Sequence, residues 1–186
     1  MNMENLRSEL KIPRERIAVL IGKDGAIKRE IEEATKTRLD IDSKEGDIFI
    51  IGPDGLGIYT AKEIVTAVGR GFNPEVAMLL LKVDYAFEHV SLQEFMGKSK
   101  DAIQRVKGRV IGSEGKTRKH IEEITETSIS VFGKTISIIG EIQHAIVARR
   151  AVEMLIEGST HSSVYKWLER KHRELKRDEV AQGWQN

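Results

Sequence analysis

An internal repeat constrains this chain more than any other feature. Residues 111–123 read Ile-Gly-Ser-Glu-Gly-Lys-Thr-Arg-Lys-His-Ile-Glu-Glu, and residues 21–33, ninety positions earlier, read Ile-Gly-Lys-Asp-Gly-Ala-Ile-Lys-Arg-Glu-Ile-Glu-Glu. The agreement continues downstream at further positions: Thr35 and Thr37 match Thr125 and Thr127, Leu39 and Ile41 match Ile129 and Val131, and, after a two-residue gap, 48–52 matches 136–140. We therefore interpret the chain as two copies of one structural unit.

Each copy has two helices that flank a turn bounded by glycines. In the first copy, apolar residues recur at helical spacing before the turn, at Ile17 and Leu20, and after it, at Ile27 and Ile31. The glycines let the backbone reverse tightly and let another backbone approach closely. Because the second helix begins at the turn, its free N–H groups and positive dipole end favour a phosphate as ligand.

Two short alternating segments follow, over residues 38–42 and 47–51, and they predict strands with Leu39 and Ile41 on one face. An apolar wall beside a phosphate-accepting turn makes a groove for a single strand of nucleic acid. The backbone would lie on one side of this groove and the bases on the other.

The repeated pattern resembles the K-homology (KH) domain, whose GxxG loop binds about four nucleotides of single-stranded RNA or DNA. The pattern consists of Ile-Gly-x-x-Gly, then x-x-x-x-x-Ile, and then a Thr-x-x-x-[IL]-x-[IV] strand. In both copies the strand pair follows the GxxG helices and precedes a further helix, which is similar to the type I, or eukaryotic-type, arrangement. The resemblance implies an α+β fold of two tandem type I KH domains, each a three-stranded antiparallel sheet packed on three helices, plus a C-terminal helix. We expect KH domain 1 over residues 1–81, KH domain 2 over 82–160, and a basic C-terminal helix with a frayed tail over 161–186.

The remaining segments complete this outline. The expected elements are a strand over 5–11, a closing helix over 56–70, a short helix over 74–81, a strand over 85–92, a polar link over 97–101, a helix over 102–111, a closing helix over 142–157, and an exposed helix over 162–180 anchored by Val164, Trp167 and Leu168.

Composition excludes several classes of protein. The 186 residues carry 32% charged and 40% hydrophobic residues with a formal net charge of +1, as in an ordinary globular protein, so any basic surface must be local. No cysteine is present for disulfides or zinc thiolates. Without a long apolar run or an N-terminal signal pattern, we expect a cytoplasmic protein.

Neither a nucleotide enzyme nor a metal enzyme is indicated. Gly115-Lys116-Thr117 resembles the end of a phosphate-binding P-loop, but that motif needs glycine at position 110, which is Val110. There is no GxGxxG, and the five histidines lack metal-ligand spacing. We expect no cofactor, no metal site and no catalytic residues. The paired acids 32–33 and 122–123 are interpreted as a solvated helix face.

Charge distinguishes the two copies. Residues 98–119 carry eight basic and two acidic residues, whereas the equivalent window 8–29 carries six basic and three acidic residues. Because affinity for a nucleic-acid backbone rises with the number of phosphates neutralised, the second copy is the better RNA site. The first copy is then a weaker RNA site or a protein-docking surface.

The expected site divides into three roles. The residues that hold the RNA backbone are Gly112, Ser113, Glu114 and Gly115. The base platform is formed by Val110, Ile111, Ile129 and Val131. Positive charge comes from Arg105, Arg109, Lys116, Arg118 and Lys119. A possible second RNA site consists of Ile21, Gly22, Lys23, Asp24, Gly25, Lys28, Leu39 and Ile41.

Three stretches resemble one KH family in particular, the archaeal Dim-two proteins, which are related to the eukaryotic Krr and partner-of-Nob ribosome-assembly factors. These are Lys107-Gly108-Arg109-Val110-Ile111-Gly112 with its following loop, Ala148-Arg149-Arg150-Ala151-Val152-Glu153-Met154-Leu155, and Gly158-Ser159-x-His161-x-x-Val164-Tyr165-x-x-Leu168-Glu169. The resemblance implies a non-catalytic adaptor that binds single-stranded RNA near the 3′ end of small-subunit ribosomal RNA, in ribosome maturation or translation initiation. Implied partners are the alpha subunit of initiation factor two and the Nob endonuclease.

Other interpretations stay open. The glycine pairs could be turn chemistry alone. The chain could be a KH protein for other single-stranded RNA or DNA, which a comparison of RNA with DNA would reveal through the 2′-hydroxyl. It could also be a protein-interaction scaffold with vestigial grooves, which would show no salt-dependent RNA binding.

Overall fold

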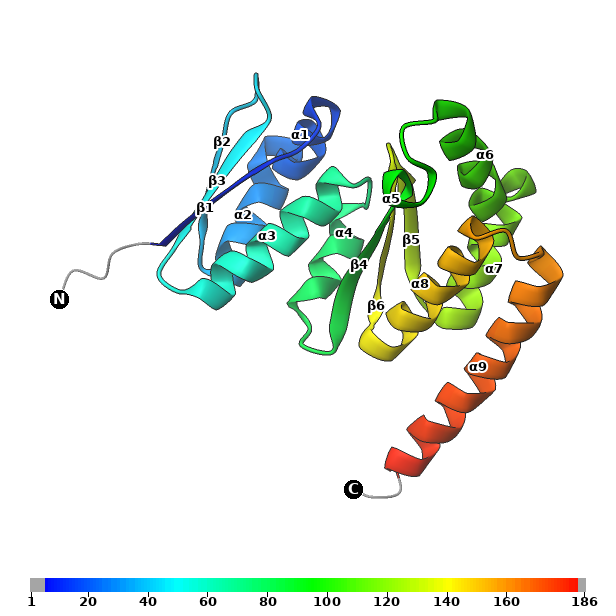
Figure 1. Cartoon of the computed structure of the whole chain (residues 1–186). Helices are drawn as coiled ribbons and strands as arrows, with labels where there is room; N and C mark the ends of the chain where they lie inside the picture. The colour runs from blue at the N-terminus through cyan, green and yellow to red at the C-terminus, as the bar shows by residue number, and fades with distance from the viewer. Residues whose placement is uncertain (1–5, 184–186) are drawn as a thin grey trace. The chain divides into compact units, whose positions relative to one another are not determined.

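The computed structural model describes residues 6–183, which fall into two compact units that divide between Tyr85 and Ala86. Figure 1 shows that each unit contains one sheet with its own helices. Position 5 of the expected first strand and residues 184–186 of the expected frayed tail lie outside the described residues. Among residues 6–183, none of the helices combines the length and apolar character needed to cross a bilayer.

The first unit has the order β-α-α-β-β-α, followed by two short helical turns. Its elements are β1 (Leu6–Lys11), α1 (Arg14–Ile21), a 3₁₀ turn (Lys23–Gly25), α2 (Ala26–Thr35), β2 (Arg38–Ile41), β3 (Asp47–Gly52), α3 (Gly55–Gly69), α4 (Pro74–Ala77) and a second 3₁₀ turn (Met78–Leu81). The antiparallel sheet has the order β1-β3-β2, with Ile50 opposite Ser8 on one side and Leu39 on the other.

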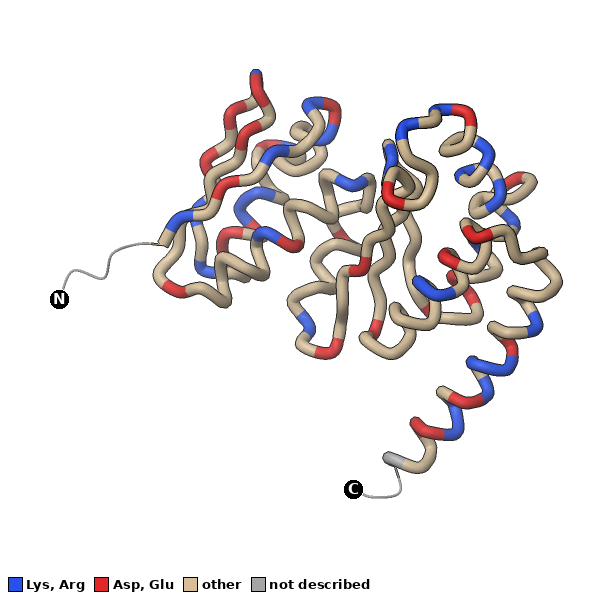
Figure 2. The backbone as a smooth tube through the Cα atoms, in the orientation of Figure 1, with Lys and Arg blue, Asp and Glu red and all other residues tan. Residues whose placement is uncertain are grey.

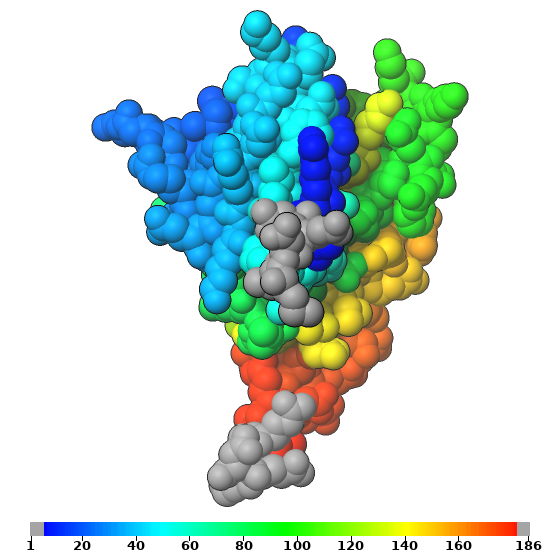
Figure 3. All heavy atoms as spheres, turned by 90° about the vertical axis from the view of Figure 1, so that its left-hand side faces the viewer, coloured from blue at the N-terminus to red at the C-terminus, as the bar shows by residue number. Residues whose placement is uncertain are grey.

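Helices α1, α2 and α3 cover one face of this sheet, because alternate strand residues are apolar on that side. Leu39, Ile48 and Ile50 are fully buried there. On the opposite face the Arg7 guanidinium lies 4.1 Å from the centre of the Phe49 ring. In Figure 3 the strands of this unit, in dark blue and cyan, reach the surface without a helix over them.

The second unit repeats this order and adds helices at two points. Its elements are β4 (Tyr85–Ser91), α5 (Leu92–Met96), α6 (Lys100–Ile111), a 3₁₀ turn (Ser113–Gly115), α7 (Lys116–Thr125), β5 (Ser128–Phe132), β6 (Thr135–Glu141), α8 (Ile142–Ile156) and α9 (His161–Gly183). The sheet order β4-β6-β5 matches that of the first unit. The predicted fold class, two type I KH domains with a C-terminal helix, is confirmed.

The threonines matched in the sequence repeat form the same helix-to-strand turn in both units. The Oγ1 atoms of Thr35 and Thr37 are 2.8 Å apart, and those of Thr125 and Thr127 are 2.9 Å apart. The residue between each pair has a left-handed backbone, with φ of 53° and 52°. The side-chain hydrogen bonds hold this backbone in place and so fix where each edge strand begins.

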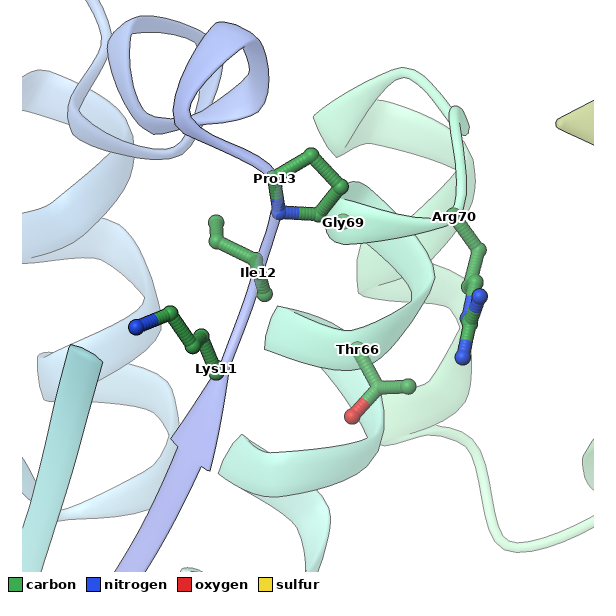
Figure 4. A pocket seen from close by; sticks show the side chains of 6 residues that line it. All are labelled: Lys11, Ile12, Pro13, Thr66, Gly69 and Arg70. Atoms are coloured by element: carbon green, nitrogen blue, oxygen red, sulfur yellow. The ribbon is translucent and has the colours of Figure 1, made fainter. Parts of the chain in front are cut away.

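The end of β1 packs directly on the end of α3. A Cβ atom at Gly69 would lie only 2.6 Å from Ile12 Cγ2, and Figure 4 shows these two residues side by side. Ile12 is 4% exposed. The close approach of strand to helix therefore requires glycine at position 69.

Two sequence expectations need correction in the second unit. The short helix α5 was not expected, and α6 begins at Lys100 instead of residue 102 because Ser99 Oγ accepts a hydrogen bond from Ala102 N at 3.3 Å. Helix α9 was expected as an exposed helix anchored by Val164, Trp167 and Leu168, and this anchor is confirmed, because the side chains of Val164 and Leu168 are fully buried. This helix is part of the hydrophobic core of the second unit.

Candidate nucleic-acid interface

The two GxxG loops have nearly the same backbone. Gly22 and Gly112 both have φ of 73° with ψ near 175°, and Gly25 and Gly115 both have φ of 75°. The acids between them, Asp24 and Glu114, take left-handed conformations with φ of 52° and 54°. The tight reversal expected from the glycine spacing is thus present in both units.

Close packing explains why the first glycine of each loop has no side chain. A Cβ atom at Gly22 would lie 2.9 Å from Ile27 N, and one at Gly112 would lie 2.8 Å from Thr117 N. The loop therefore lies against the first turn of the following helix. At the start of α2 and α7 no side chain caps the N-terminus, although the first N–H groups, those of Ala26 and Lys116, donate within the loop to Lys23 O and Ser113 O. The positive dipole end of each helix therefore lies at the loop without a charged side chain bound to it.

Exposure divides the expected site residues into three groups. Those that are exposed are Lys23, Asp24, Arg105, Ser113, Glu114, Lys116 and Lys119. Those that are partly buried are Ile21, Gly22, Gly25, Lys28, Ile41, Arg109, Ile111, Gly112, Gly115, Arg118 and Val131. Those that are buried are Leu39, Val110 and Ile129.

This distribution narrows the expected base platform. Val110 and Ile129 belong to the hydrophobic core cluster of the second unit, with exposures of 0% and 5%, so their side chains support the groove from beneath. Ile111 and Val131 keep partly accessible side chains, and Ile21 and Ile41 do the same in the first unit. These residues remain the candidates for apolar contact with bases.

The first glutamate of each Glu-Glu pair was expected on a solvated helix face, and the structure corrects this. Glu32 Oε1 accepts a hydrogen bond from Leu39 N, and Glu122 Oε1 accepts one from Ile129 N, both at 2.7 Å. Each carboxylate therefore ties the GxxG helix to the edge strand of the sheet. The repeat contained a signal for this hydrogen bond, because both copies place the glutamate seven residues before the matching strand residue.

The edge strand still presents polar groups to the groove. Strands β2 and β5 each pair with one neighbour and so have an open edge. Leu39 and Ile129 direct their N–H groups to this edge, and because direction alternates along a strand, Ile41 and Val131 direct their N–H and C=O groups the same way. Backbone donors and acceptors of this kind can bind the polar edge of an unpaired base.

Basic side chains surround the two loops differently. Lys116 Nζ lies 3.6 Å from Glu114 Oε2 and offsets its charge, whereas position 26 of the first unit is alanine. In the first unit Arg29 Nη1 instead donates to the carbonyl oxygen of Asp24 at 2.7 Å. Lys28 and Arg118 occupy matched positions in the two units. Lys28 Nζ lies 3.9 Å from Glu32 Oε1, and Arg118 Nε lies 3.7 Å from Glu122 Oε2.

Arg109 was expected to supply positive charge to RNA, but its guanidinium is engaged inside the domain. Its Nε donates to Leu155 O at 3.2 Å and its Nη2 donates to Ser159 O at 2.6 Å, so it caps the C-terminal end of α8. In the first unit Arg16 caps α3 in the same way, through Val68 O and Phe72 O.

The hairpin beside each groove adds a second electrostatic difference. Figure 2 shows several acidic residues, in red, on the β2–β3 hairpin of the first unit. This hairpin has more acidic than basic residues, namely Asp40, Asp42, Glu45 and Asp47 against Arg38 and Lys44. In the second unit the turn between β5 and β6 carries one charged residue, Lys134. The backbone N–H groups of Lys44 and Glu45 lower the pKa of Asp42 and keep it ionised. The second unit is therefore the more favourable site for a phosphate backbone.

A contact between α9 and the GxxG helix α7 was not expected from the sequence. Tyr165 Oη donates to Thr117 Oγ1 at 3.1 Å, and the His120 ring meets the Tyr165 ring edge to face with centroids 4.2 Å apart. Seven residues further along both helices, His172 Nδ1 lies 2.9 Å from Ile124 O. Helix α9 thus runs parallel to α7 and supports it from the loop to its C-terminal end.

Within residues 6–183, no group of three or more His, Cys, Asp or Glu side chains is placed so that it could hold a metal ion. In each unit the GxxG loop at a helix N-terminus lies on the same side as an open sheet edge, to which the following helix is tied by Glu32 or Glu122. Helix dipole ends favour anions and open strand edges offer backbone donors and acceptors, which are the two kinds of group that recognise an extended nucleic-acid strand.

Two family models match the chain. The model of the KH domain matches residues 7–67, and a model described as eukaryotic type KH-domain (KH-domain type I) matches residues 86–173. The second match includes the first half of α9.

Several curated proteins are similar in sequence. The KH domain-containing protein MJ0443 of Methanocaldococcus jannaschii is 44% identical over 172 residues, which is 90% of this chain and 75% of that protein. The RNA-binding protein PNO1 of Oryzias latipes is 35% identical over 60% of this chain, and the pre-rRNA-processing protein PNO1 of Chaetomium thermophilum is 31% identical over 57%. The chain matches less than half the length of these two PNO1 proteins, 46% and 42%.

Two solved structures have the same fold at substantial identity. Dim2p from Pyrococcus horikoshii OT3 is 45% identical with a TM-score of 0.82, covering 89% of this chain and 99% of that one. A chain in the a/eIF2alpha-aDim2p-rRNA complex from the same organism is 43% identical with a TM-score of 0.85, covering 93% and 97% of the two chains.

Proposed function

Because this chain belongs to the archaeal KH-domain proteins homologous to Dim2p and PNO1, we propose that it is a non-catalytic adaptor that binds single-stranded ribosomal RNA near the 3′ end of the small-subunit molecule. It would act in ribosome maturation or translation initiation, in the cytoplasm. The main support is the second groove, where an uncapped helix N-terminus, an open strand edge and exposed basic residues lie together.

Each part of this groove would have its own role. The loop Gly112–Gly115 and the first turn of α7 would hold phosphates through backbone N–H groups, with Lys116 and Lys119 adding charge. Ile111 and Val131 would contact base faces, and the open edge of β5 would read base edges. Low aromatic content, 5% of residues, means that bases would lie on aliphatic side chains, so affinity per base should be modest.

Two proteins are proposed as partners beside the RNA. The alpha subunit of initiation factor two is supported by the Pyrococcus horikoshii complex that contains a/eIF2alpha, aDim2p and rRNA. The Nob endonuclease follows from the family resemblance. The acidic hairpin of the first unit makes that unit the better candidate for a protein contact.

The experiment that tests the proposal is fluorescence-anisotropy titration with a labelled RNA copying the 3′ end of small-subunit ribosomal RNA, at two salt concentrations. Ser113→Asp and Lys23→Asp each place two carboxylates in one GxxG loop, where they would repel a phosphate. Ser113→Asn and Lys23→Asn are the matched neutral controls. DNA of the same sequence tests for recognition of the 2′-hydroxyl.

We expect Ser113→Asp to abolish most binding and Lys23→Asp to weaken it less. Equal losses in both variants would indicate one continuous site over two domains. Binding that survives both substitutions, or that does not depend on salt, would overturn the groove mechanism and leave the scaffold interpretation.

A further inference from the structure

Helix α9 carries a row of four basic residues on one face, Lys166, Arg170, Arg173 and Arg177. Their spacing of four, three and four residues places them along one side of the helix. All four are exposed, and Figure 2 marks basic residues in blue along this helix. We call these four residues the basic stripe.

The basic stripe faces away from the domain. Val164 and Leu168, which are fully buried, precede Lys166 and Arg170 by two positions, and two positions correspond to about 200° around a helix. The side of α9 that packs on the domain is therefore opposite the stripe. Eleven residues separate its ends, so it extends over about 16 Å.

The stripe charges are not neutralised by fixed partners. Among residues 6–183, none of these four side chains has a hydrogen-bond partner or an ion-pair partner. By contrast, the other lysines of α9 are paired, since Lys171 Nζ lies 2.6 Å from Glu174 and Lys176 Nζ lies 2.8 Å from Glu126.

Acidic residues border the stripe without entering it. Glu174, which is next to Arg170 and Arg177, is held by Lys171, and Asp178 lines the groove between α8 and α9. Glu169 and Glu179 lie toward the α7 side, where Glu179 binds Lys176 and His144.

The stripe begins beside the RNA loop of the second unit. Tyr165, which immediately precedes Lys166, donates its hydroxyl to Thr117 in the first turn after the GxxG loop. The buried residues and the contact of His172 with α7 fix α9 in this position. A rigid row of cations therefore extends from the loop that would hold phosphates.

We propose that the basic stripe of α9 is a second contact surface for the RNA backbone, which binds nucleotides that flank the segment held in the GxxG groove. A phosphate backbone fits because its charges are regularly spaced, the stripe has no apolar residues, and the positions are continuous with the groove. This inference rests on the proposed function and extends its footprint beyond about four nucleotides.

The test uses the full-length protein and three labelled RNAs. One has the length of the groove, about five nucleotides, and the other two add about six nucleotides of unstructured sequence on the 5′ or the 3′ side. The stripe variant is Arg170→Gln/Arg173→Gln, and the matched control is Lys171→Gln/Lys176→Gln, which removes the same charge from the same helix at positions that are ion-paired.

We expect one extended RNA to bind the intact protein at least fivefold more tightly than the short RNA. The stripe variant should lose about tenfold in affinity for that RNA. The slope of log affinity against log salt concentration, which we call the salt slope, should become less steep by about 1.4, which corresponds to two phosphates. Its affinity for the short RNA should stay unchanged. The control variant should keep the advantage of the extended RNA.

The outcomes separate this inference from the proposed function. Failure of the short RNA to bind the intact protein contradicts the groove itself. Normal binding of the short RNA with no gain from either extension overturns the proposal that the stripe binds RNA. The stripe would then be a contact surface for an acidic protein. Equal losses in the stripe and control variants would also overturn it, since general charge would then explain the effect.

Discussion

At the scale of single residues, the two glycines of each GxxG loop are required for different physical reasons. Gly112 has φ of 73° and ψ of 174°, a region essentially restricted to glycine, and a Cβ there would overlap Thr117. Gly115 has φ of 75° and ψ of 11°, and no atom lies within 4 Å of its Cβ position. Glycine is required at position 112 by both the lack of space and the backbone conformation, and at position 115 by the backbone conformation alone.

This difference predicts unequal effects on stability. Gly112→Ala should lower the free energy of unfolding by about 3 kcal/mol or more, because strain and overlap add. Gly115→Ala should lower it by about 1 kcal/mol, the usual cost of a left-handed alanine. Urea unfolding followed by circular dichroism measures both, and equal losses would contradict the role assigned to Thr117.

Arg109 shows how a residue expected at the RNA surface can serve the fold. Arg109→Met keeps the aliphatic stem but removes the hydrogen bonds to Leu155 O and Ser159 O, so we expect a loss of about 2 kcal/mol in stability. The salt slope of RNA binding should not change. Arg105→Met, at an exposed position, should do the reverse and lower the salt slope by about 0.7.

At the scale of elements, α9 contributes to the core instead of extending from it. Leu168 is fully buried, so Leu168→Ala should destabilise the second unit by about 2–5 kcal/mol. Leu56→Ala, at a helix position in the first unit that is 75% exposed, is the matched control and should cost less than about 0.5 kcal/mol. Similar losses in urea unfolding would mean that α9 is not anchored as described.

The far end of α9 is attached by an ion cluster. Lys176 donates to Glu126 and Glu179, which lowers the pKa of both carboxyls, and His144 adds a second contact to Glu179. Because a lowered pKa means that protons bind the unfolded chain more readily, this stabilisation is present above pH 4.5, the ordinary value for glutamate, and disappears as pH falls below it.

Lys176→Met should therefore reduce the loss of stability of the second unit between about pH 6 and about pH 3.5. The melting temperature measured across this range reports the change. Lys166→Met, which removes an exposed lysine of the same helix, should leave the pH dependence as it is. An unchanged pH dependence in Lys176→Met would show that the cluster does not contribute.

At the scale of the whole molecule, two loops of the same backbone geometry lie in different electrostatic surroundings. Lys116 offsets Glu114 in the second loop, while the matched position in the first loop is Ala26. A reciprocal exchange tests whether this charge sets the difference. Lys116→Ala should weaken RNA binding severalfold and lower the salt slope by about 0.7.

Ala26→Lys should strengthen RNA binding by the first unit, which is best measured in the Ser113→Asp background, where binding by the second loop is suppressed. A gain of severalfold with a steeper salt slope is expected. No gain would mean that the acidic β2–β3 hairpin, more than the missing lysine, keeps RNA from the first groove.

The sequence alone determined the repeat, the KH fold and the position of both loops. Glycine spacing, alternating apolar residues and matched threonines are local features, and local backbone conformation depends on them directly. The open helix N-terminus at each GxxG loop follows from the same local information. The charge difference between the copies was also readable, because it depends on composition within a short window.

Which side chains are available to a ligand depends on burial and on long-range hydrogen bonds, which the folded chain alone reveals. Periodicity identified Val110, Ile129 and Leu39 as apolar strand and helix residues but could not show that they are buried. Arg109 binds the carbonyl oxygens of Leu155 and Ser159, 46 and 50 residues away, and nothing in its local sequence distinguishes it from a solvated charge. Hydrogen bonds and burial between distant segments form only when the chain is packed, so the accessible groove had to be read from the structure.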